Sequence, residues 1–285
     1  MALKINYNFQ SDFTHANMLK TEAAMNKNLE RLATGHRINR AADDAAGLYI
    51  ADQLKTYALS VDQGTRNAQD GVSIAQIAQG SLGEVYNILN DIKSKTIQAS
   101  NTSDDNSREM LQQDINKLVD SIGKIFSDTE FNGMNIFSSG GTQTFKIHYG
   151  GRTNQELDIV SAQAGATAGA TGADTSTVNI DGTDYVIDVT SQENANTSVQ
   201  TVDDLIKAVD KQAAAFGSAQ IELEKIISNN ETQAVNTRDA EGRIRNVDFA
   251  KEMADFTKNN ILMQSGTSML AQANQQSQLV LQLLR

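Results

Sequence analysis

The sequence predicts a mainly α protein: an elongated antiparallel helical bundle or coiled coil of N- and C-terminal helices, with a small β-hairpin region in the middle of the chain. Three observations predict this class. The 285 residues contain no Pro, where average usage gives roughly a dozen, so long uninterrupted helices are permitted. Apolar residues recur at three- and four-residue intervals in both end regions. The middle of the chain alternates apolar and polar residues instead.

The first predicted helix lies between Thr14 and Asn39. Gly35 offers a break, because glycine adopts backbone conformations that end helices. The apolar residues of this segment keep helical spacing, and they are Met18, Met25, Leu29 and Leu32.

A long helix is expected from about residue 45 to 99, and at 1.5 Å per residue it would measure ~80 Å. Its apolar stripe steps by three and four residues through Ile74, Ala78, Leu82, Val85, Leu89 and Ile92. A polar break at 101–106 follows, rich in residues that cap helices. The third helix then carries Leu111, Ile115, Leu118, Ile122 and Ile125, and it ends near a turn at 131–133.

The period changes to two in the middle of the chain. Residues 144–149 and 156–160 are expected to form a hairpin around Gly150 and Gly151. Residues 162–173 are low in complexity (Ala, Gly and Thr) and indicate a flexible surface link. A second hairpin is expected from 177–180 and 185–189, which flank the turn-forming pair Asp181–Gly182.

Helix returns from about Val199, with Leu205, Val209, Phe216, Ala219, Leu223 and Ile226 in a heptad-like register. The last forty residues keep similar steps, through Phe249, Met253, Phe256, Leu262, Met269, Ala273, Val280 and Leu283. Residues 279–285 (LVLQLLR) form a dense apolar patch that should have a partner.

Composition excludes several function classes. A net charge of −11 argues against nucleic acid as a ligand, because affinity for phosphates comes from Lys and Arg. The chain has no Cys, which removes disulfides, thiolate metal sites and a cysteine nucleophile. No stretch approaches 18 consecutive apolar residues, so no membrane span is expected. The first residues lack the apolar core of a signal peptide, so export without a cleaved signal is expected.

The residues that could carry chemistry do not form a site in the sequence. His15, His36 and His148 lie far apart, and no metal-binding motif accompanies them. Adjacent acids such as Asp104 and Asp105 do not face each other on a helix, and they fit capping positions better than an acid–base pair. We therefore expect no metal, no cofactor and no enzymatic activity.

Periodicity alone leaves two readings of the terminal stripes. They fit the core of a stable, soluble helical-bundle binding protein, and they fit equally an interface for assembly with other chains. The abrupt apolar C-terminus and the low aromatic content, 5 %, favour assembly.

Longer blocks at both ends carry a family resemblance. Residues 28–39 (NLERLATGHRIN) with 42–48 (ADDAAGL) resemble the N-terminal signature of bacterial flagellins, and 66–76 (RNAQDGVSIAQ) resemble the next block. Residues 243–252 (RIRNVDFAKE) and 266–275 (GTSMLAQANQ) are similar to the C-terminal signature. The resemblance covers roughly 1–160 and 200–285, in the family's order.

The resemblance implies a domain layout. Residues 1–43 with 243–285 would form a terminal coiled-coil core, disordered in the monomer. Residues 44–162 with 199–242 would form a helical rod with a hairpin, and 163–198 a short, variable, surface-exposed insert. In the family, rod packing switches the filament supercoil, and we place that adjustability near 144–160.

The resemblance also implies a function: the structural subunit of the flagellar filament, exported unfolded and polymerised through its terminal helices. The implied partners are other copies of the chain, the filament cap, the hook–filament junction proteins, an export chaperone and the type III export apparatus, and the implied location is extracellular. The candidate subunit-interface residues are Met18, Met25, Leu29, Arg31, Leu32, Phe249, Met253, Phe256, Leu262, Met269, Leu270, Val280, Leu283 and Leu284.

One stretch departs from flagellins that a host Toll-like receptor senses. Asp91 stands where Arg is usual, and Lys95 stands where Leu is usual. An acid in place of a base and a charge in place of an apolar anchor both weaken such an interface, so receptor recognition is expected to be weakened.

Two alternatives to the filament subunit stay open at this point. The hook–filament junction protein shares the terminal architecture, although the full C-terminal block and the short middle favour the filament subunit. The soluble helical-bundle binding protein is the alternative from a different functional class.

Overall fold

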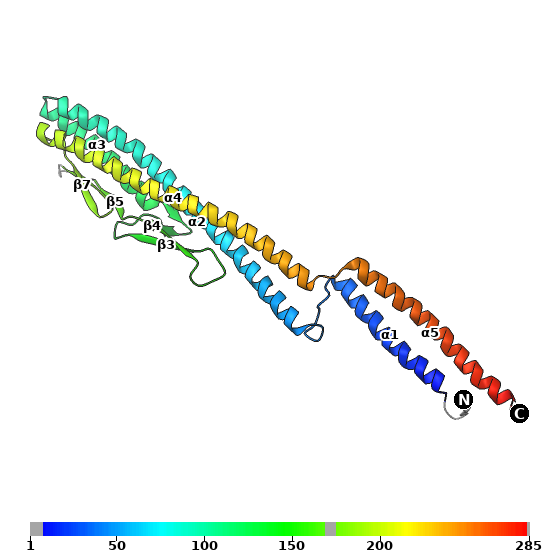
Figure 1. Ribbon diagram of the computed structural model, residues 1–285. Helices are drawn as coiled ribbons and strands as arrows, with labels where there is room; N and C mark the ends of the chain where they lie inside the picture. Colours follow the sequence, from blue (N-terminus) through cyan, green and yellow to red (C-terminus); the bar gives the residue numbers. More distant parts are fainter. Residues whose placement is uncertain (1–7, 169–174, 284–285) are drawn as a thin grey trace. The chain divides into compact units, whose positions relative to one another are not determined.

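The computed structural model describes residues 8–168 and 175–283, with side chains described up to residue 275. Five helices and seven short strands follow one another in these ranges (Figure 1). The helices are α1 (Phe9–Thr34), α2 (Ala45–Asn101), α3 (Asp105–Asp128), α4 (Gln192–Arg245) and α5 (Phe249–Leu283). The strands are β1 (Glu130–Phe131), β2 (Met134–Asn135), β3 (Gln143–His148), β4 (Glu156–Ser161), β5 (Ala164–Thr167), β6 (Ser176–Ile180) and β7 (Thr183–Ile187). The predicted mainly α class with small sheets in the middle is confirmed.

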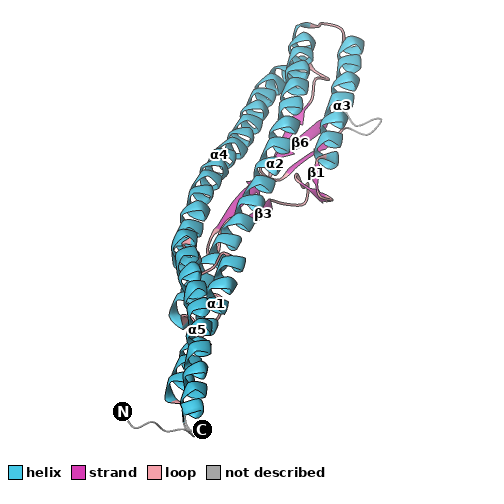
Figure 2. Ribbon diagram, turned by 90° about the vertical axis from the view of Figure 1, so that its right-hand side faces the viewer, coloured by secondary structure: helices cyan, strands magenta, loops and turns pink. Residues whose placement is uncertain are grey.

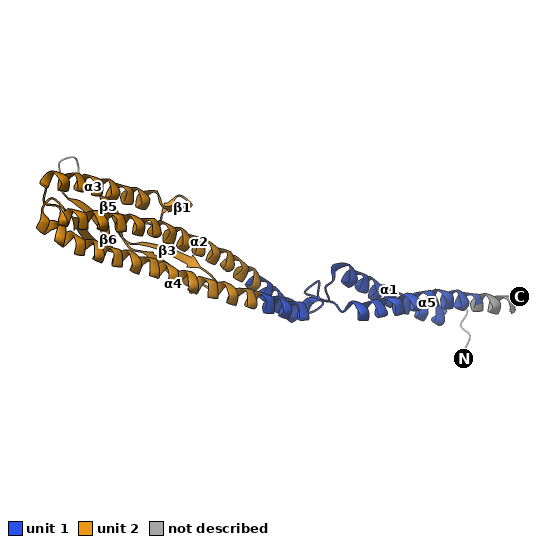
Figure 3. Ribbon diagram, turned by 90° about the horizontal axis from the view of Figure 1, so that it is seen from above, with its two compact units in different colours: residues 1–57, 235–285 blue, residues 58–234 orange. Residues whose placement is uncertain are grey.

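The chain divides into two compact units, which we call unit 1 (Met1–Tyr57 with Val235–Arg285) and unit 2 (Ala58–Ala234) (Figure 3). Helices α2 and α4 each contribute to both units. Each unit is described by itself.

Unit 2 has a continuous apolar core. Parts of α2 and α4 run alongside α3, and the strands lie against these helices (Figure 2). The α2 stripe predicted from the sequence is buried in this core, with Leu82, Val85 and Leu89 no more than 2 % exposed. Phe137 joins the helices, because its ring contacts Phe126 and Phe216 edge-on at centroid distances of 5.2 and 6.2 Å.

The strands of unit 2 pair antiparallel in three small sheets: β1 with β2, β3 with β4, and β5–β6–β7. Both predicted hairpins, 144–149 with 156–160 and the one around Asp181–Gly182, are confirmed. The β6–β7 turn holds Asp181 at φ 58° and Gly182 at φ 73°, the left-handed conformations that a two-residue hairpin turn requires. Asn132 and Gly133 do the same between β1 and β2.

The expected flexible link at 162–173 is wrong for its first part. Ala164–Thr167 form β5, which pairs with β6 and packs against α3. Small side chains make this packing close: a Cβ added to Gly123 of α3 would lie 3.0 Å from the Ala166 carbonyl oxygen. Low complexity here reflects tight packing of strand on helix, and residues 169–174 lie outside the described part of the chain.

Helix α4 begins earlier than expected, at Gln192 rather than near Val199. Ser191 caps it, since its hydroxyl accepts from the Asn194 N–H at 3.2 Å. Ala195 and Ser198 are buried in this first part. The start was missed because the buried residues are small or polar and show no apolar stripe.

Unit 1 is built on the pair α1 and α5, which run side by side in opposite directions (Figure 1). Helix α1 ends as predicted at Gly35, whose φ of 72° is left-handed and whose N–H donates to the Arg31 carbonyl. Asp248 begins α5 by accepting from the N–H groups of Ala250 and Lys251. Backbone hydrogen bonds join the segment around His36, which follows α1, to the segment around Asn246, which precedes α5.

Candidate functional site: the apolar surface of the terminal helices

Unit 1 lacks the buried core that unit 2 has. Among its described hydrophobic residues only Ile38, Ala51 and Ala273 are buried. Large apolar side chains of α1 and α5 instead face outward, each at least 45 % exposed. They are Phe9, Phe13, Leu19 and Leu29 on α1, and Phe249, Met253, Ile261, Leu262 and Met269 on α5. We call these nine residues the terminal apolar surface.

The candidate interface residues divide into two groups. Five lie in the terminal apolar surface: Leu29, Phe249, Met253, Leu262 and Met269. The others are half-buried: Met18, Met25, Arg31, Leu32, Phe256 and Leu270. Val280, Leu283 and Leu284 lie outside the described side chains.

The structure adds apolar residues that the sequence reasoning missed. Phe9 and Phe13 of α1 are 65 % and 57 % exposed, and their rings stack at a centroid distance of 6.1 Å. Their four-residue spacing is the signal that could have found them, because residues at i and i+4 share one helix face. Leu19 and Ile261 were also missed, because they lie off the predicted stripes.

Polar contacts hold the end of α1 to the chain that follows it. The Lys27 ammonium lies 2.7 Å from the Asp43 carboxylate. The N–H groups of Asn39 and Arg40 donate to the same carboxylate, each at 3.2 Å. The Lys27 hydrogen bond, followed by that from the Asn39 N–H, lowers the pKa of Asp43 to about 2.

The two units differ in charge. Unit 1 holds 13 Lys or Arg against 11 Asp or Glu, a net charge of +2, whereas unit 2 holds 11 against 24, a net charge of −13. The acidity of the chain therefore belongs to unit 2. Repulsion between copies is expected to be concentrated there, and the apolar ends carry little of it.

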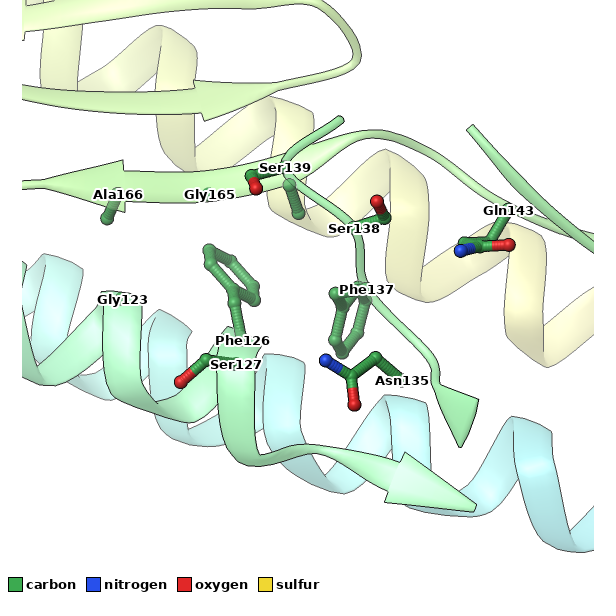
Figure 4. A pocket seen from close by; sticks show the side chains of 11 residues that line it. Gly123, Phe126, Ser127, Asn135, Phe137, Ser138, Ser139, Gln143, Gly165 and Ala166 are labelled. Carbon is green, nitrogen blue, oxygen red and sulfur yellow. The ribbon is translucent and has the colours of Figure 1, made fainter. Parts of the chain in front are cut away.

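A pocket of about 380 Å³ lies in unit 2 between the end of α3, the 135–139 segment and β5 (Figure 4). The rings of Phe126 and Phe137 form part of its wall, with Ser127, Ser138 and Gln143 nearby. Its lining includes no Asp, Glu, His, Lys or Cys. The pocket therefore offers no general acid, general base or ionisable nucleophile.

Within the described ranges, no three His, Cys, Asp or Glu residues gather as a metal site would require. Across those same residues, no helix combines the length and apolar character needed to cross a membrane. The terminal apolar surface is thus the feature that calls for an explanation.

The two receptor-patch departures lie on α2 in unit 2. Asp91 is exposed. Lys95 is half-buried, and its ammonium lies 3.0 Å from the Asp114 carboxylate on α3. The neighbouring Lys93 pairs with Asp203 at 2.6 Å. The lysines of this stretch therefore make ion pairs to the helices on either side of α2.

Comparison with known proteins relates this arrangement to a family. The model of the bacterial flagellin N-terminal helical region matches residues 5–142, and that of the C-terminal helical region matches residues 199–284. The chain belongs to the bacterial flagellin family. Among its relatives are Flagellin FlaB2 of Treponema pallidum, 36 % identical, and a flagellin of Halalkalibacterium halodurans, 37 % identical, each aligned over 99 % of both chains. A Bacillus subtilis flagellin is 36 % identical over 99 % of this chain and 100 % of its own length.

Family membership gives the function of the chain. The protein is a structural subunit of the bacterial flagellar filament, and it assembles with other copies of itself. Matches at both ends and along whole relatives favour this function over a soluble binding bundle. Flagellins are a structural family rather than a family of enzymes.

Proposed function

We propose that this flagellin polymerises by burying the terminal apolar surface of α1 and α5 against neighbouring copies. The observation that carries the proposal is the contrast between the units: unit 2 has a continuous buried apolar core, whereas unit 1 buries only Ile38, Ala51 and Ala273 among its described hydrophobic residues and exposes nine large apolar side chains on α1 and α5. At ~25 cal/mol per Å², burying even ~1,000 Å² of apolar surface per end contributes about 25 kcal/mol before ordering costs are subtracted.

The domain roles follow from this proposal. Residues 1–43 with 243–285 form the filament core. Residues 44–162 with 199–242 form the rod around it, and 163–198 form the short outward-facing part. The half-buried apolar residues between α1 and α5 hold this helix pair only weakly in water, so the two helices become fully ordered on assembly.

The proposed partners beyond other copies serve delivery and assembly. Exposed amphipathic ends suit an export chaperone that covers them before secretion through the type III apparatus. The filament cap and the hook–filament junction proteins would meet the same surface at the two ends of the polymer. We further propose that the chain catalyses no reaction, and that Asp91 and the engaged Lys95 weaken recognition by the host receptor.

Seeded polymerisation of the full-length chain tests the proposal. Leu262→Asp places a charge on the exposed surface and should abolish sedimentable filaments. Gln264→Asp introduces the same charge at an exposed polar position of the same helix, on a face turned away from Leu262, and should assemble nearly normally. Normal filaments from Leu262→Asp would refute the assembly surface.

Limited proteolysis of the unassembled chain provides a second test. Cleavage should remove both ends quickly and leave unit 2 intact, since only unit 2 has a buried core. Ends as resistant as unit 2 would indicate that the stripes are an internal core.

A further inference from the structure

The seam between α1 and α5 repeats every seven residues. On α1 the half-buried positions Met18, Met25 and Leu32 are one heptad apart. On α5, Phe256, Met263 and Leu270 show the same spacing. If one helix slid past the other by a heptad, large apolar residues would still meet large apolar residues. The apolar seam alone therefore specifies the register of the pair weakly.

Polar side chains interrupt this repeat at one end of the seam, where α1 ends and α5 begins. Asn28 of α1 and Glu252 of α5 are both buried, at 7 % exposure. Arg31 lies 3.5 Å from the Glu252 carboxylate, and its own Nε is buried without a hydrogen-bond partner among the described residues. We call Asn28, Arg31 and Glu252 the polar lock.

Asn28 is fully engaged across the seam. The side-chain amide is oriented so that both its nitrogen and its oxygen have hydrogen-bond partners. In this orientation Nδ2 donates to the Glu252 carboxylate at 2.9 Å and to the Ala24 carbonyl at 3.0 Å. Its Oδ1 accepts from the Phe256 N–H and from the Asn259 amide, each at 3.2 Å. Three of these four contacts reach α5, so a slide of either helix breaks them together.

A notch two heptads from Glu252 gives an independent marker of the same register. A Cβ placed on Gly266 would lie 3.3 Å from Cγ of Met18, so glycine allows that side chain to approach α5 closely. In a helix slid by one heptad, Met18 would meet a residue with a side chain.

We propose that the polar lock sets the register of α1 on α5, and so decides which apolar side chains the pair presents outward. Burying a carboxylate is expensive unless it is paired. The slide of one heptad that brings Glu252 opposite Met25 takes its buried carboxylate away from Asn28 and Arg31, which penalises that register. The backbone bridge between His36 and Asn246 opposes the same slide. The role in assembly rests on the proposed function, whereas the register itself does not.

The absence of Cys from the chain makes the register measurable by disulfide trapping. Met18→Cys with Gly266→Cys reports the observed register, and Ser11→Cys with Gly266→Cys reports the slide of one heptad that brings Glu252 opposite Met25. Filaments are oxidised and run on a non-reducing gel, where an intrachain bond gives a fast-migrating monomer and a bond between copies gives a dimer. The unaltered lock should give the intrachain bond with the first pair alone.

The lock is then removed with Asn28→Leu and Glu252→Leu. The ratio of first-pair to second-pair trapping should fall by at least about tenfold, as expected when a buried ionic contact no longer penalises the slide. Asn26→Leu with Lys251→Leu, at exposed positions of the same helices, is the matched control and should leave the ratio unchanged. An unchanged ratio in the lock variant overturns the proposal.

A second variant keeps the test decisive if the leucine variant does not assemble. Glu252→Gln keeps the shape and removes the charge, and it should show an intermediate ratio. Loss of assembly in both lock variants, with a normal control, would assign the cluster to folding rather than to register and would also overturn the proposal. If instead the register follows the lock while Leu262→Asp still polymerises, the assembly surface fails and the lock stands.

Discussion

Single residues decide where the elements of this flagellin begin and end. Asp44 accepts from the Gly47 N–H at 2.9 Å at the start of α2, and Gly35 ends α1 with a left-handed backbone. Gly182 completes the β6–β7 turn at φ 73°. Gly80 differs from these, because it lies in the middle of α2 with no atom within 4 Å of an added Cβ.

Alanine at Gly182 and alanine at Gly80 should have opposite effects on the free energy of unfolding of the unassembled chain. Gly182→Ala forces a Cβ into a left-handed conformation and should lower the free energy of unfolding of unit 2 by about 1 kcal/mol. Gly80→Ala removes backbone freedom from the unfolded chain and should raise it by about 1 kcal/mol. Urea unfolding followed by circular dichroism measures both, and two changes of the same sign would contradict the expectation.

The contacts of Asp43 predict a pH dependence. Its folded pKa of about 2 lies below the ordinary value of 3.8, so its stabilisation is complete above about pH 4 and is lost as the pH falls toward 2. Asp43→Asn should therefore lower the melting temperature of filaments at pH 7, and the difference from the unaltered chain should vanish near pH 2. Asp12→Asn, at an exposed position of α1, is the control. A difference that stays constant with pH would exclude this mechanism.

At the scale of elements, the long helices could be predicted because their burial follows the heptad pattern. The α2 stripe from Ile74 to Ile92 lies in the core, and the helix spans Ala45–Asn101, close to the expected 45–99. Strand β5 and the start of α4 could not be predicted, because Ala, Gly and Ser can be buried without an apolar signal. The sequence also did not separate the seam side of α5 from its exposed side, since Phe256 and Met253 look alike as apolar residues.

Buried polar side chains join elements in a way that periodicity does not reveal. Gln112 of α3 is 3 % exposed, and its Oε1 accepts from the Val189 N–H at 2.7 Å. It thereby ties α3 to the chain that follows β7. Neighbouring Gln113 is exposed.

Alanine substitutions at these neighbours form a matched pair. Gln112→Ala leaves a buried N–H without a partner and should lower the free energy of unfolding by about 1–3 kcal/mol. Gln113→Ala should change it by less than about 0.5 kcal/mol. Urea midpoints of the two variants, compared at equal slope, measure the difference. Equal effects would show that the hydrogen bond to Val189 contributes nothing.

At the scale of the whole molecule, apolar surface and charge are assigned to different units. Unit 1 carries +2 and the terminal apolar surface, whereas unit 2 carries −13 and a closed core. In the proposed assembly, attraction between copies comes from the ends and repulsion comes from unit 2. We expect this division to favour solubility of the unassembled chains without preventing polymerisation.

Salt should shift this balance toward the filament. Raising ionic strength from 10 mM to 150 mM shortens the screening length from about 30 Å to about 8 Å, which weakens repulsion between copies of unit 2 while leaving apolar burial in place. The critical concentration for seeded polymerisation should fall several-fold over this range. Asp91→Asn with Glu109→Gln, both at exposed positions of unit 2, should lower it at 10 mM and flatten its dependence on salt. A critical concentration that rises with salt would show instead that ion pairs between copies drive assembly, and the variant would then assemble less well.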